Sequence, residues 1–274
     1  MLMMQQLHEA KAYIQQHTEN FAPEFGIILG TGLGALVNEI KIQYSLSYAD
    51  IPHFPVSTVE GHKGKLIFGT IAGKPIVAMA GRFHFYEGYS PEDVVFPIRV
   101  FKFLGVETLL LSNAAGGVDP QLKVGDLMII TDHISLSTVN PLIGKNDDRL
   151  GPRFPDMSEP YSKELVQRAK SIAQRLDINL KEGVYFGVTG PTFETRAEYK
   201  MIHVMGGSAV GMSTVQEVII ASHMGMKVFA MSVITDVGIR EEENRITHQE
   251  VLEAAHAAEP RFSAIFRELI IALN

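Results

Sequence analysis

Cysteine and tryptophan are both absent from the 274 residues of this sequence. Without cysteine the chain cannot form a disulfide, a thiolate metal site or a cysteine nucleophile, and the absence fits a reducing compartment. The usual metal and serine-hydrolase signatures are missing too: there is no His-Glu-x-x-His, no calcium loop and no Gly-x-Ser-x-Gly. We therefore expect no dedicated metal site.

Positive charge is also scarce. The chain has 24 Lys and Arg against 31 Asp and Glu, a formal net charge of −7. This balance argues against a nucleic-acid partner, because proteins that bind nucleic acid normally present a basic face. A phosphate site is still compatible with an acidic protein, since a few cations and aligned backbone amides can hold one anion.

Long apolar runs are missing as well. No stretch approaches the roughly 18 residues that a membrane-spanning helix needs. Near the N-terminus, Leu2, Leu7, Ala10 and Ile14 recur at helical spacing, which predicts an amphipathic helix rather than a signal peptide. We expect a cytoplasmic protein without a membrane partner.

No Ser/Gly/Pro-rich linker, charge block or internal repeat divides the chain, so we predict one domain over residues 1–274. Short runs rich in Ile, Val and Leu predict strands at Phe25–Leu29, Lys65–Ile71, Pro75–Ala80, Glu107–Leu111, Leu127–Ile134, Glu182–Val188 and Lys227–Ile234. Segments of helical period predict helices at Pro91–Leu104, Tyr161–Leu176, Arg196–Met205, Val215–Met224 and Thr247–Ala257. This alternation predicts a layered α/β domain with a central mixed, mostly parallel β-sheet flanked by helices.

Two connections carry further predictions. The segment Ile71–Pro75 is short enough to join two antiparallel strands. Pro260 has no backbone donor, so it should separate the helix Thr247–Ala257 from a final helix over Arg261–Leu273. Because ligands of open α/β sheets bind where strands end, the loops that follow the strands are expected to carry the site.

The loop Gly30–Gly34 follows the first predicted strand and is rich in glycine. Glycines let a backbone approach an anion closely, and Thr31 adds a hydroxyl donor. The spacing Gly-x-Gly-x-Gly differs from both the dinucleotide and the P-loop patterns. For this loop alone, a tight turn without a ligand is an equally good interpretation.

Residues 81–88 follow another predicted strand. In an extended chain Arg82, His84 and Tyr86 would project to one face, because side chains alternate along a strand. Arg82 offers a planar fork of donors for an oxyanion, and His84 can donate or accept a proton near neutral pH. A solvated arginine and a surface histidine are the commoner alternative, but the adjacent glycines and the position after a strand favour function.

Residues 210–217 form a third candidate segment. Ser213 with Gln216, and Thr214 with Glu217, both match a capping box, so the segment predicts a capped helix. A helix N-terminus that presents hydroxyls and free amides can also seat a phosphate. The sequence leaves both interpretations open.

Three further segments are compatible with a site and with simple packing. The small residues Ser112–Gly117 leave room and amides for a ligand, or allow close backbone packing. Phe193 can stack on a flat base or fill the core, and Glu194 can face a ligand or the positive end of a helix. The predicted strand that runs to residue 234 is followed by Thr235 and Asp236, and this aspartate can serve a site or cap a loop.

Taken together, these segments resemble the trimeric purine nucleoside phosphorylase family, including its methylthioadenosine phosphorylase relatives, across nearly the whole chain. The matching segments are LGTGLG (29–34), EGHKG (60–64), GRFHFYEGY (81–89), SNAAGG (112–117), NPLIGKNDDRLGPRFPDMS (140–158), GPTFET (190–195), VGMSTVQEV (210–218) and THQEVL (247–252). Each is weak alone, but eight in the expected order are highly specific. The resemblance implies a homotrimer that reversibly cleaves purine (deoxy)ribonucleosides in purine salvage, with phosphate as co-substrate and no cofactor.

The resemblance also implies roles for individual residues. His84, Glu194 and Asp236 would be catalytic. Phosphate would be held by Thr31, His62, Arg82, His84, the Ala114 backbone and Ser213. Ribose would contact Tyr86, Met212, His248 and Phe154, the last from a neighbouring subunit. The purine would lie against Gly116, Tyr185, Phe193, Glu194, Val210, Thr235 and Asp236.

Asp236 departs from the pattern of the family members that cleave 6-oxopurine nucleosides, which have Asn at this position. An ionised Asp236 cannot donate to purine N7, whereas a protonated one can, provided that burial raises its pKa. Aspartate is also the residue of the adenosine-cleaving relatives, but those relatives lack Glu194, which suits the N1–H of a 6-oxopurine. We expect inosine and guanosine to remain substrates, with Asp236 acting as an N7 acid or extending the range to adenosine.

Three other functions fit the sequence less well. Methylthioadenosine phosphorylase fits less well, because Glu194 suits an N1–H and His248 suits a 5′-hydroxyl rather than a thioether. A dinucleotide-binding dehydrogenase would need a different glycine spacing and would leave Arg82 and Ser213 without a role. A non-catalytic nucleoside-binding protein would not release the base in the presence of phosphate.

Overall fold

A computed structural model describes residues 2–31, 33–56, 64–239 and 246–273. Within these residues the strands are β1 (Phe25–Leu29), β2 (Lys41–Ser47), β3 (Lys65–Ile71), β4 (Lys74–Ala80), β5 (Thr108–Gly117), β6 (Leu127–Ile134), β7 (Leu180–Gly187), β8 (Ala209–Gly211) and β9 (Lys227–Val237). The α-helices are α1 (Leu2–His17), α2 (Pro91–Val94), α3 (Phe96–Leu104), α4 (Lys163–Arg175), α5 (Arg196–Val204), α6 (Val215–His223) and α7 (His248–Ala272).

All of these strands join one mixed sheet in the order β2-β3-β4-β1-β5-β8-β7-β6-β9. Strand β9 also pairs with β5 in parallel, so that β5, β8, β7, β6 and β9 close into a ring. The pairings of β1 with β4 and β5 are parallel, as are those of β7 with β6 and β8. The expected α/β fold with a central mixed sheet and flanking helices is confirmed.

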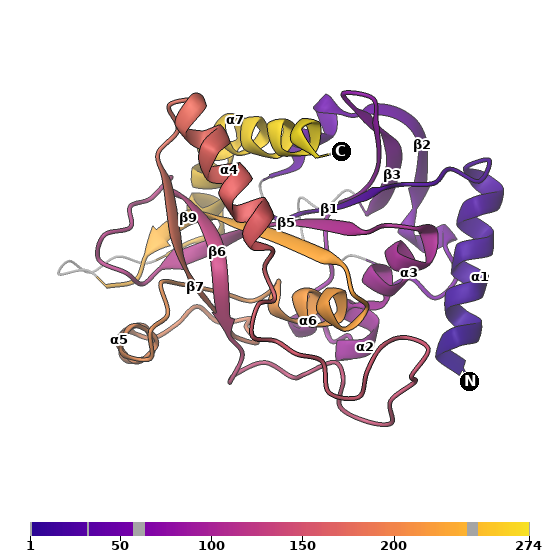
Figure 1. Ribbon diagram of the computed structural model, residues 1–274. Helices are drawn as coiled ribbons and strands as arrows, with labels where there is room; N and C mark the ends of the chain where they lie inside the picture. The colour runs from indigo at the N-terminus through magenta and orange to yellow at the C-terminus, as the bar shows by residue number, and fades with distance from the viewer. Residues whose placement is uncertain (1, 32, 57–63, 240–245, 274) are drawn as a thin grey trace.

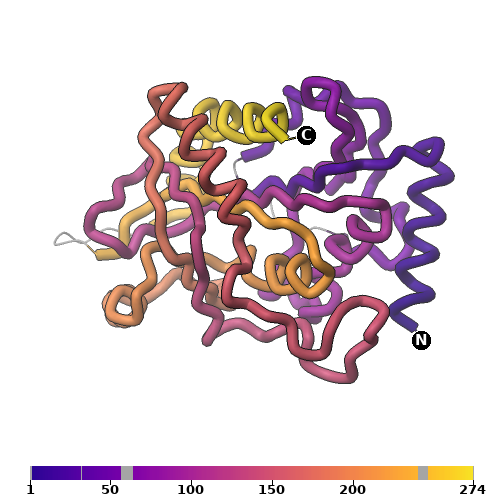
Figure 2. Tube along the Cα trace, viewed as in Figure 1, coloured from indigo at the N-terminus to yellow at the C-terminus, as the bar shows by residue number. Residues whose placement is uncertain are grey.

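Helices cover both faces of the sheet (Figure 1). Along β1, Ile28 packs into a core cluster that includes residues of α1, α3 and α6, whereas Ile27 packs into the cluster with α4 and α7. This alternation follows from the strand geometry, because successive side chains point to opposite faces. Figure 2 shows α1 beside the sheet, at the opposite end from α5.

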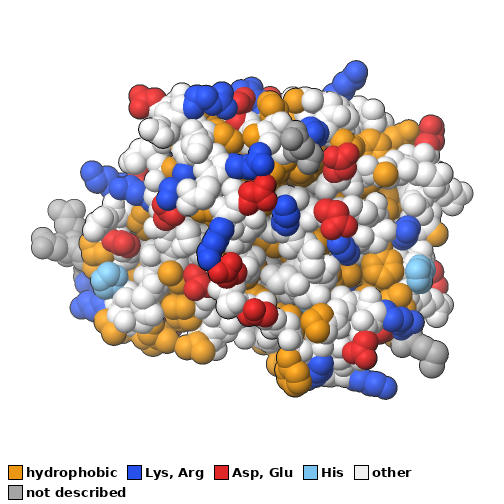
Figure 3. Space-filling model, viewed as in Figure 1, with side chains coloured by type: hydrophobic (Ala, Val, Ile, Leu, Met, Phe, Trp, Pro, Cys, Tyr) orange, Lys and Arg blue, Asp and Glu red, His pale blue; other side chains and the backbone are white. Residues whose placement is uncertain are grey.

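Charged side chains of both signs are mixed on the face drawn in Figure 3. In the described part of the chain, no helix is both long and apolar enough to cross a membrane. The same residues contain no cluster of three His, Cys, Asp or Glu side chains that could hold a metal ion.

Several sequence predictions are confirmed at the level of single elements. The first helix spans Leu2–His17 and buries Leu7, Ala10 and Ile14. Strands β3 and β4 pair antiparallel across a tight turn, in which Ala72 and Gly73 have φ of 50° and 84°. Such positive values at both central residues are typical of a two-residue hairpin.

Other boundaries were wrong. Strand β5 does not end at Leu111 but continues to Gly117, because its small residues pair with β9 up to Val237. The predicted helix over Pro91–Leu104 is divided into α2 and α3 at Val95. Strands β2 and β8 were not predicted: β2 is a largely exposed edge strand without a clear apolar pattern, and β8 has three residues.

The predicted break at Pro260 is also wrong, because α7 is one continuous helix of 25 residues with Pro260 inside it. Its apolar face explains the continuity. Ala255, Ala258, Phe262 and Phe266 are buried against the sheet on both sides of the proline. Burial of a large apolar side chain contributes about 1.5–3 kcal/mol, so a few such residues offset the roughly 3 kcal/mol that an internal proline costs.

We therefore expect the Pro260→Ala substitution to stabilise the protein, by up to about 3 kcal/mol, because alanine restores the missing backbone donor and removes the ring clash. Pro260 is exposed, so the change leaves no cavity. The measurement is the free energy of unfolding in urea. Ala257→Pro, at an exposed position in the same helix, should have the opposite effect. A variant with the same or a lower free energy of unfolding than the parent would contradict a destabilising effect of Pro260.

Candidate active site

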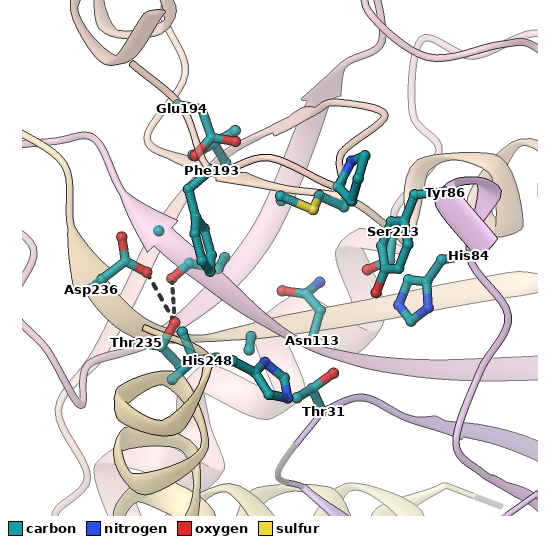
Figure 4. Close-up of a pocket in the computed structure, with 18 of the residues that line it drawn as sticks. Thr31, His84, Tyr86, Asn113, Phe193, Glu194, Ser213, Thr235, Asp236 and His248 are labelled. Carbon is teal, nitrogen blue, oxygen red and sulfur yellow. Dashed lines mark hydrogen bonds between the residues drawn. The ribbon is translucent and has the colours of Figure 1, made fainter. Parts of the chain in front are cut away.

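A cavity of about 270 Å³ opens where several strands end. Its walls come from the turn after β1, the segment after β4, the carboxyl ends of β5 and β9, the segments that precede α5 and α6, and the start of α7. Figure 4 shows two ends of this pocket, with His84, Tyr86 and Ser213 on one side and Phe193, Glu194 and Asp236 on the other. The position agrees with the rule that ligands bind beyond the carboxyl ends of strands.

Arg82 anchors the first end of the pocket. Its side chain is buried, and its Nε and Nη2 donate to the two carboxylate oxygens of Glu217 at 3.1 and 2.8 Å. Its Nη1 donates to the backbone carbonyl of Ser112. Bidentate pairing of this kind fixes the plane of a guanidinium, so β4, β5 and α6 together determine where the remaining N–H groups of Arg82 point.

The predicted capping boxes at the start of α6 are therefore wrong. Glu217 lies on the buried side of the helix and pairs with Arg82, and Gln216 donates to the carbonyl of Val139. No side-chain bond caps this helix at Thr214. Both pairs had the right spacing for a capping box. However, leaving the buried Arg82 charge unpaired would cost more free energy than a surface cap contributes, which is about 1 kcal/mol.

A strained turn presents Ser213 to the pocket. Thr214 has φ 72° and ψ −52°, and the N–H of Val215 donates to the carbonyl of Ser213 at 2.8 Å. This is the rare γ-turn, and a β-branched residue at such a positive φ costs about 1–3 kcal/mol. The Thr214 hydroxyl accepts from Asn113 Nδ2 at 2.9 Å and lies 3.1 Å from the Ser213 hydroxyl. These contacts hold the strained turn in place.

His84 lies beside Arg82 with its tautomer set by Glu87. Its Nδ1 is 3.0 Å from Glu87 Oε1, and an ionised carboxylate can only accept, so Nδ1 carries a proton. Burial, together with repulsion from Arg82, lowers the pKa of His84 below its ordinary value of 6.5, although Glu87 opposes the shift. The imidazole is therefore neutral at neutral pH. Its ring stacks on Tyr86 with centroids 4.7 Å apart.

Gly30 and Asn113 bring β1 and β5 together under this end of the pocket. A Cβ at Gly30 would lie 2.6 Å from the Ser112 carbonyl oxygen, so only glycine allows this approach. Close packing is therefore one reason for the glycine loop, and Thr31 still lines the pocket beside it. The Oδ1 of Asn113 is buried and has no hydrogen-bond partner among the described residues. It is an acceptor available to a ligand hydroxyl.

The opposite end of the pocket holds two carboxylates. Burial, and to a smaller extent the charge of Asp236, raises the pKa of Glu194. Asp236 is buried, and its Oδ1 accepts from the Thr235 hydroxyl at 3.2 Å. A Cβ at Gly116 would lie 2.9 Å from Asp236 Oδ2, so the absence of a side chain there leaves room for the carboxylate. Phe193 lies below Glu194 and to the right of Asp236 in Figure 4, and its partly exposed ring lines the pocket.

The pocket gathers most of the predicted site residues. Those that line it are Thr31, Arg82, His84, Tyr86, Ala114, Gly116, Phe193, Glu194, Val210, Met212, Ser213, Thr235, Asp236 and His248. Tyr185 lies behind the wall, where its hydroxyl accepts from the Ser213 N–H at 3.3 Å. Phe154 is 87% exposed and lines a second hollow elsewhere on the surface. His62 lies outside the described residues.

Sequence reasoning missed the supporting residues of the pocket. Glu217 and Glu87 hold Arg82 and His84, and Asn113 and Tyr199 line the cavity itself. Asn113 stood in a segment already singled out for its small residues. The pairing of Arg82 with Glu217 spans 135 positions, so no local pattern could reveal it.

Glu217→Gln should lower the thermal stability of the ligand-free protein and increase its stabilisation by phosphate. The variant leaves the buried charge of Arg82 without its carboxylate, a loss worth up to about 3–5 kcal/mol. Phosphate, used here as an anion probe, would replace that partner. The measurement is the unfolding temperature over a phosphate titration. Glu164→Gln, in exposed ion pairs with Arg168 and Lys227, is the control and should change little. Equal phosphate shifts in all three proteins would contradict the role of Glu217.

Comparison with known proteins agrees with this geometry. The family model for the phosphorylase superfamily matches residues 24–271. Purine nucleoside phosphorylase 1 of Bacillus subtilis is 49% identical over 98% of each chain. A solved structure of isoform 2 of the Schistosoma mansoni purine nucleoside phosphorylase, in complex with cytosine and ribose-1-phosphate, superposes with a TM-score of 0.93 at 44% identity, over 98% of this chain and 97% of that one. The Schistosoma mansoni enzyme in complex with adenosine gives 0.92 at 41% identity over the same shares. The chain belongs to the purine nucleoside phosphorylase family.

Proposed function

We propose that this chain catalyses the reversible phosphorolysis of purine (deoxy)ribonucleosides to the free base and pentose 1-phosphate, with inosine and guanosine as its main substrates. The observation that carries the proposal is one pocket with a donor-rich end at Arg82, His84 and Ser213 and a base-sized end between Phe193, Glu194 and Asp236. Tyr86, Met212 and His248 lie in the same pocket and would contact the sugar.

The first end fits a phosphate that carries one proton. The Arg82 guanidinium, the Ser213 hydroxyl and the backbone near Ala114 would donate to the ionised oxygens. Neutral His84, with its proton on Nδ1, would accept from the phosphate hydroxyl through Nε2. This tautomer therefore orients the attacking oxygen and draws its proton away from the nucleophile.

The reaction needs few groups beyond correct placement. Phosphate oxygen bonds to C1′ as the bond from C1′ to N9 breaks, and the electron pair of that bond moves into the purine. Orientation of two bound reactants can supply roughly 7–11 kcal/mol. Donors at the departing base add a few kcal/mol each, because they meet charge that develops only in the transition state.

Glu194 and Asp236 would define the base. An ionised Glu194 accepts the N1–H of a 6-oxopurine, and a protonated Asp236 donates to N7. The reverse assignment, with Glu194 protonated and Asp236 ionised, suits N1 and the 6-amino group of adenine. The relative that was solved with adenosine bound supports including adenosine in the substrate range.

A homotrimer also belongs to the proposal. Segment 136–154 leaves Leu136, Ile143 and Phe154 between 70% and 87% exposed. Ile143 and Phe154 line one surface hollow, and exposed apolar side chains that lie together are typical of contact surfaces. In a trimer Phe154 would reach the pocket of a neighbouring subunit. A cytoplasmic location and a role in purine salvage remain predictions from the sequence and the family.

Base release from inosine, guanosine, adenosine and methylthioadenosine, with and without phosphate, tests the function. We expect phosphate-dependent release, fastest from inosine or guanosine. Release without phosphate would indicate a hydrolase, and a large preference for methylthioadenosine would assign a different substrate class.

Substitutions at the base end should change this preference in opposite directions. Glu194→Gln should lower kcat/KM for inosine by roughly 10- to 100-fold, because a hydrogen bond to a charged acceptor is worth about 1.5–3 kcal/mol. Asp236→Asn should raise the ratio of inosine to adenosine, because the amide donates to N7 at every pH. Glu164→Gln, at an exposed position outside the pocket, is the control. An unchanged ratio in Asp236→Asn would mean that Asp236 does not contact the base.

The acid limb of the pH profile of kcat/KM should lie below pH 6.5. Because burial lowers the pKa of His84, the neutral form that accepts the phosphate proton persists to a more acidic pH than for a free histidine. The Glu87 carboxylate raises this pKa, so Glu87→Gln should move the limb further down. Phosphate ionises identically in both assays, so the shift between the two profiles of kcat/KM reports His84. Superimposable profiles would exclude His84 as the group observed.

A further inference from the structure

Tyr199 occupies a position that the function above does not use. It lies in α5, is 3% exposed, and lines the pocket. Its ring packs so closely against Gly238 that a Cβ there would lie 2.1 Å from Cδ1. Its hydroxyl donates to Asp236 Oδ2 at 3.4 Å, and the Glu194 carboxylate is close enough to raise the pKa of the same phenol. One buried phenol therefore connects the two carboxylates that face the base.

A count of protons shows what this arrangement requires. A tyrosine hydroxyl has one proton to donate and can also accept. Between two ionised carboxylates it would satisfy one and face the lone pairs of the other. A single additional proton removes this conflict, because a neutral carboxyl at one side can donate to the phenol oxygen while the phenol donates to the ionised carboxylate at the other.

Tyrosine itself does not supply that proton. Burial and the charges of Asp236 and Glu194 raise the pKa of Tyr199 far above its ordinary value of 10.0, so the phenol stays neutral. Among the residues that the structure describes, the other titratable groups at this end are Glu198, on α5, whose charge acts on Glu194, and His248, which lines the pocket from α7. Glu198 already accepts from the N–H and hydroxyl of Thr195.

We propose that Tyr199 is a positioning residue that relays one shared proton between Glu194 and Asp236 and so adapts the site to 6-oxo and 6-amino purines. In the step, the Glu194 proton moves to the phenol oxygen while the phenol proton moves to Asp236 Oδ2. Two protons each shift by one place, and the net charge is unchanged. Glu194 is then ionised for an N1–H, Asp236 is neutral and can turn its proton to N7, and Tyr199 donates to Glu194.

The reverse state serves adenine. Neutral Glu194 donates to N1, ionised Asp236 accepts from the 6-amino group, and Tyr199 donates to Asp236. In both states the phenol donates a hydrogen bond to the ionised carboxylate, and the neutral carboxyl donates its proton to the purine. The inference rests on the proposed function, because it assigns how the base end of that site selects its base.

Tyr199→Phe tests the relay, since phenylalanine keeps the ring against Gly238 and removes only the hydroxyl. We expect kcat/KM to fall roughly tenfold for both inosine and adenosine, the size of one hydrogen bond to a charged group. The alkaline limb for inosine should also move to lower pH, because the shared proton loses the phenol that holds it. Unfolding temperatures confirm that the variant is folded.

Two comparisons separate this role from a structural one. In the Asp236→Asn background there is no second carboxylate. Tyr199→Phe should then leave the alkaline limb of the pH profile in place and lower kcat/KM much less than it does in the parent. Tyr161→Phe, which removes another buried hydroxyl that contacts His133 away from the pocket, should not move the limb. Equal losses in both backgrounds with superimposable pH profiles would overturn the relay. Absence of phosphorolysis in the unsubstituted protein would instead overturn the proposed function.

Discussion

The pocket depends on the buried pairing of Arg82 with Glu217. Neither charge could remain in this position alone, because an isolated ion in a protein interior costs several kcal/mol. Together, and with the Ser112 carbonyl as a third partner, they join the segment after β4 to β5 and α6. The start of α6 then lies where Ser213 faces the same space as Arg82. The strained turn at Thr214 can persist because this pairing holds the helix that follows it.

The same pairing determines the electrostatics of the donor-rich end. Glu217 offsets the charge of Arg82, and His84 is neutral beside Glu87, so the ligand-free pocket carries little net positive charge there. An anion would be bound mainly by donors already in place, not by a strong field. Preorganised donors cost little reorganisation when charge moves during a reaction. A site of this kind suits a reversible reaction, because neither phosphate nor a sugar phosphate would be held too tightly to leave.

The sequence predicted those features that depend on neighbouring residues. Apolar runs located most strands within a few residues, and the loops after them contained Thr31, Arg82, His84, Glu194 and Asp236. Predictions failed where contacts between residues far apart in the sequence determine the local structure. Residues 112–117 look like a loop but extend a strand along β9, and an internal proline does not break a helix whose apolar face is buried on both sides. The spacing of Thr214 and Glu217 indicated a cap, whereas the carboxylate belongs to a guanidinium 135 positions away.

The two ends of the pocket differ in how their protons are held. The donor-rich end has one fixed arrangement for phosphate, whereas the base end has two arrangements that differ in the base they select. At the first end, Glu87 fixes the tautomer of His84, and Glu217 fixes the plane of Arg82. At the other end, Glu194 and Asp236 compete for the single donor of Tyr199, so the arrangement has two states of similar connectivity. The base end is built mainly from β9, α5 and the segment before it, and the phosphate end from the segments after β1 and β4, from β5 and from the start of α6. Strand β5 also reaches the base end, where Gly116 leaves room for Asp236. Because positions 194, 199 and 236 lie outside the segments that hold Arg82 and Glu217, a change in base preference at these positions leaves the buried ion pair, and with it the placement of phosphate, intact.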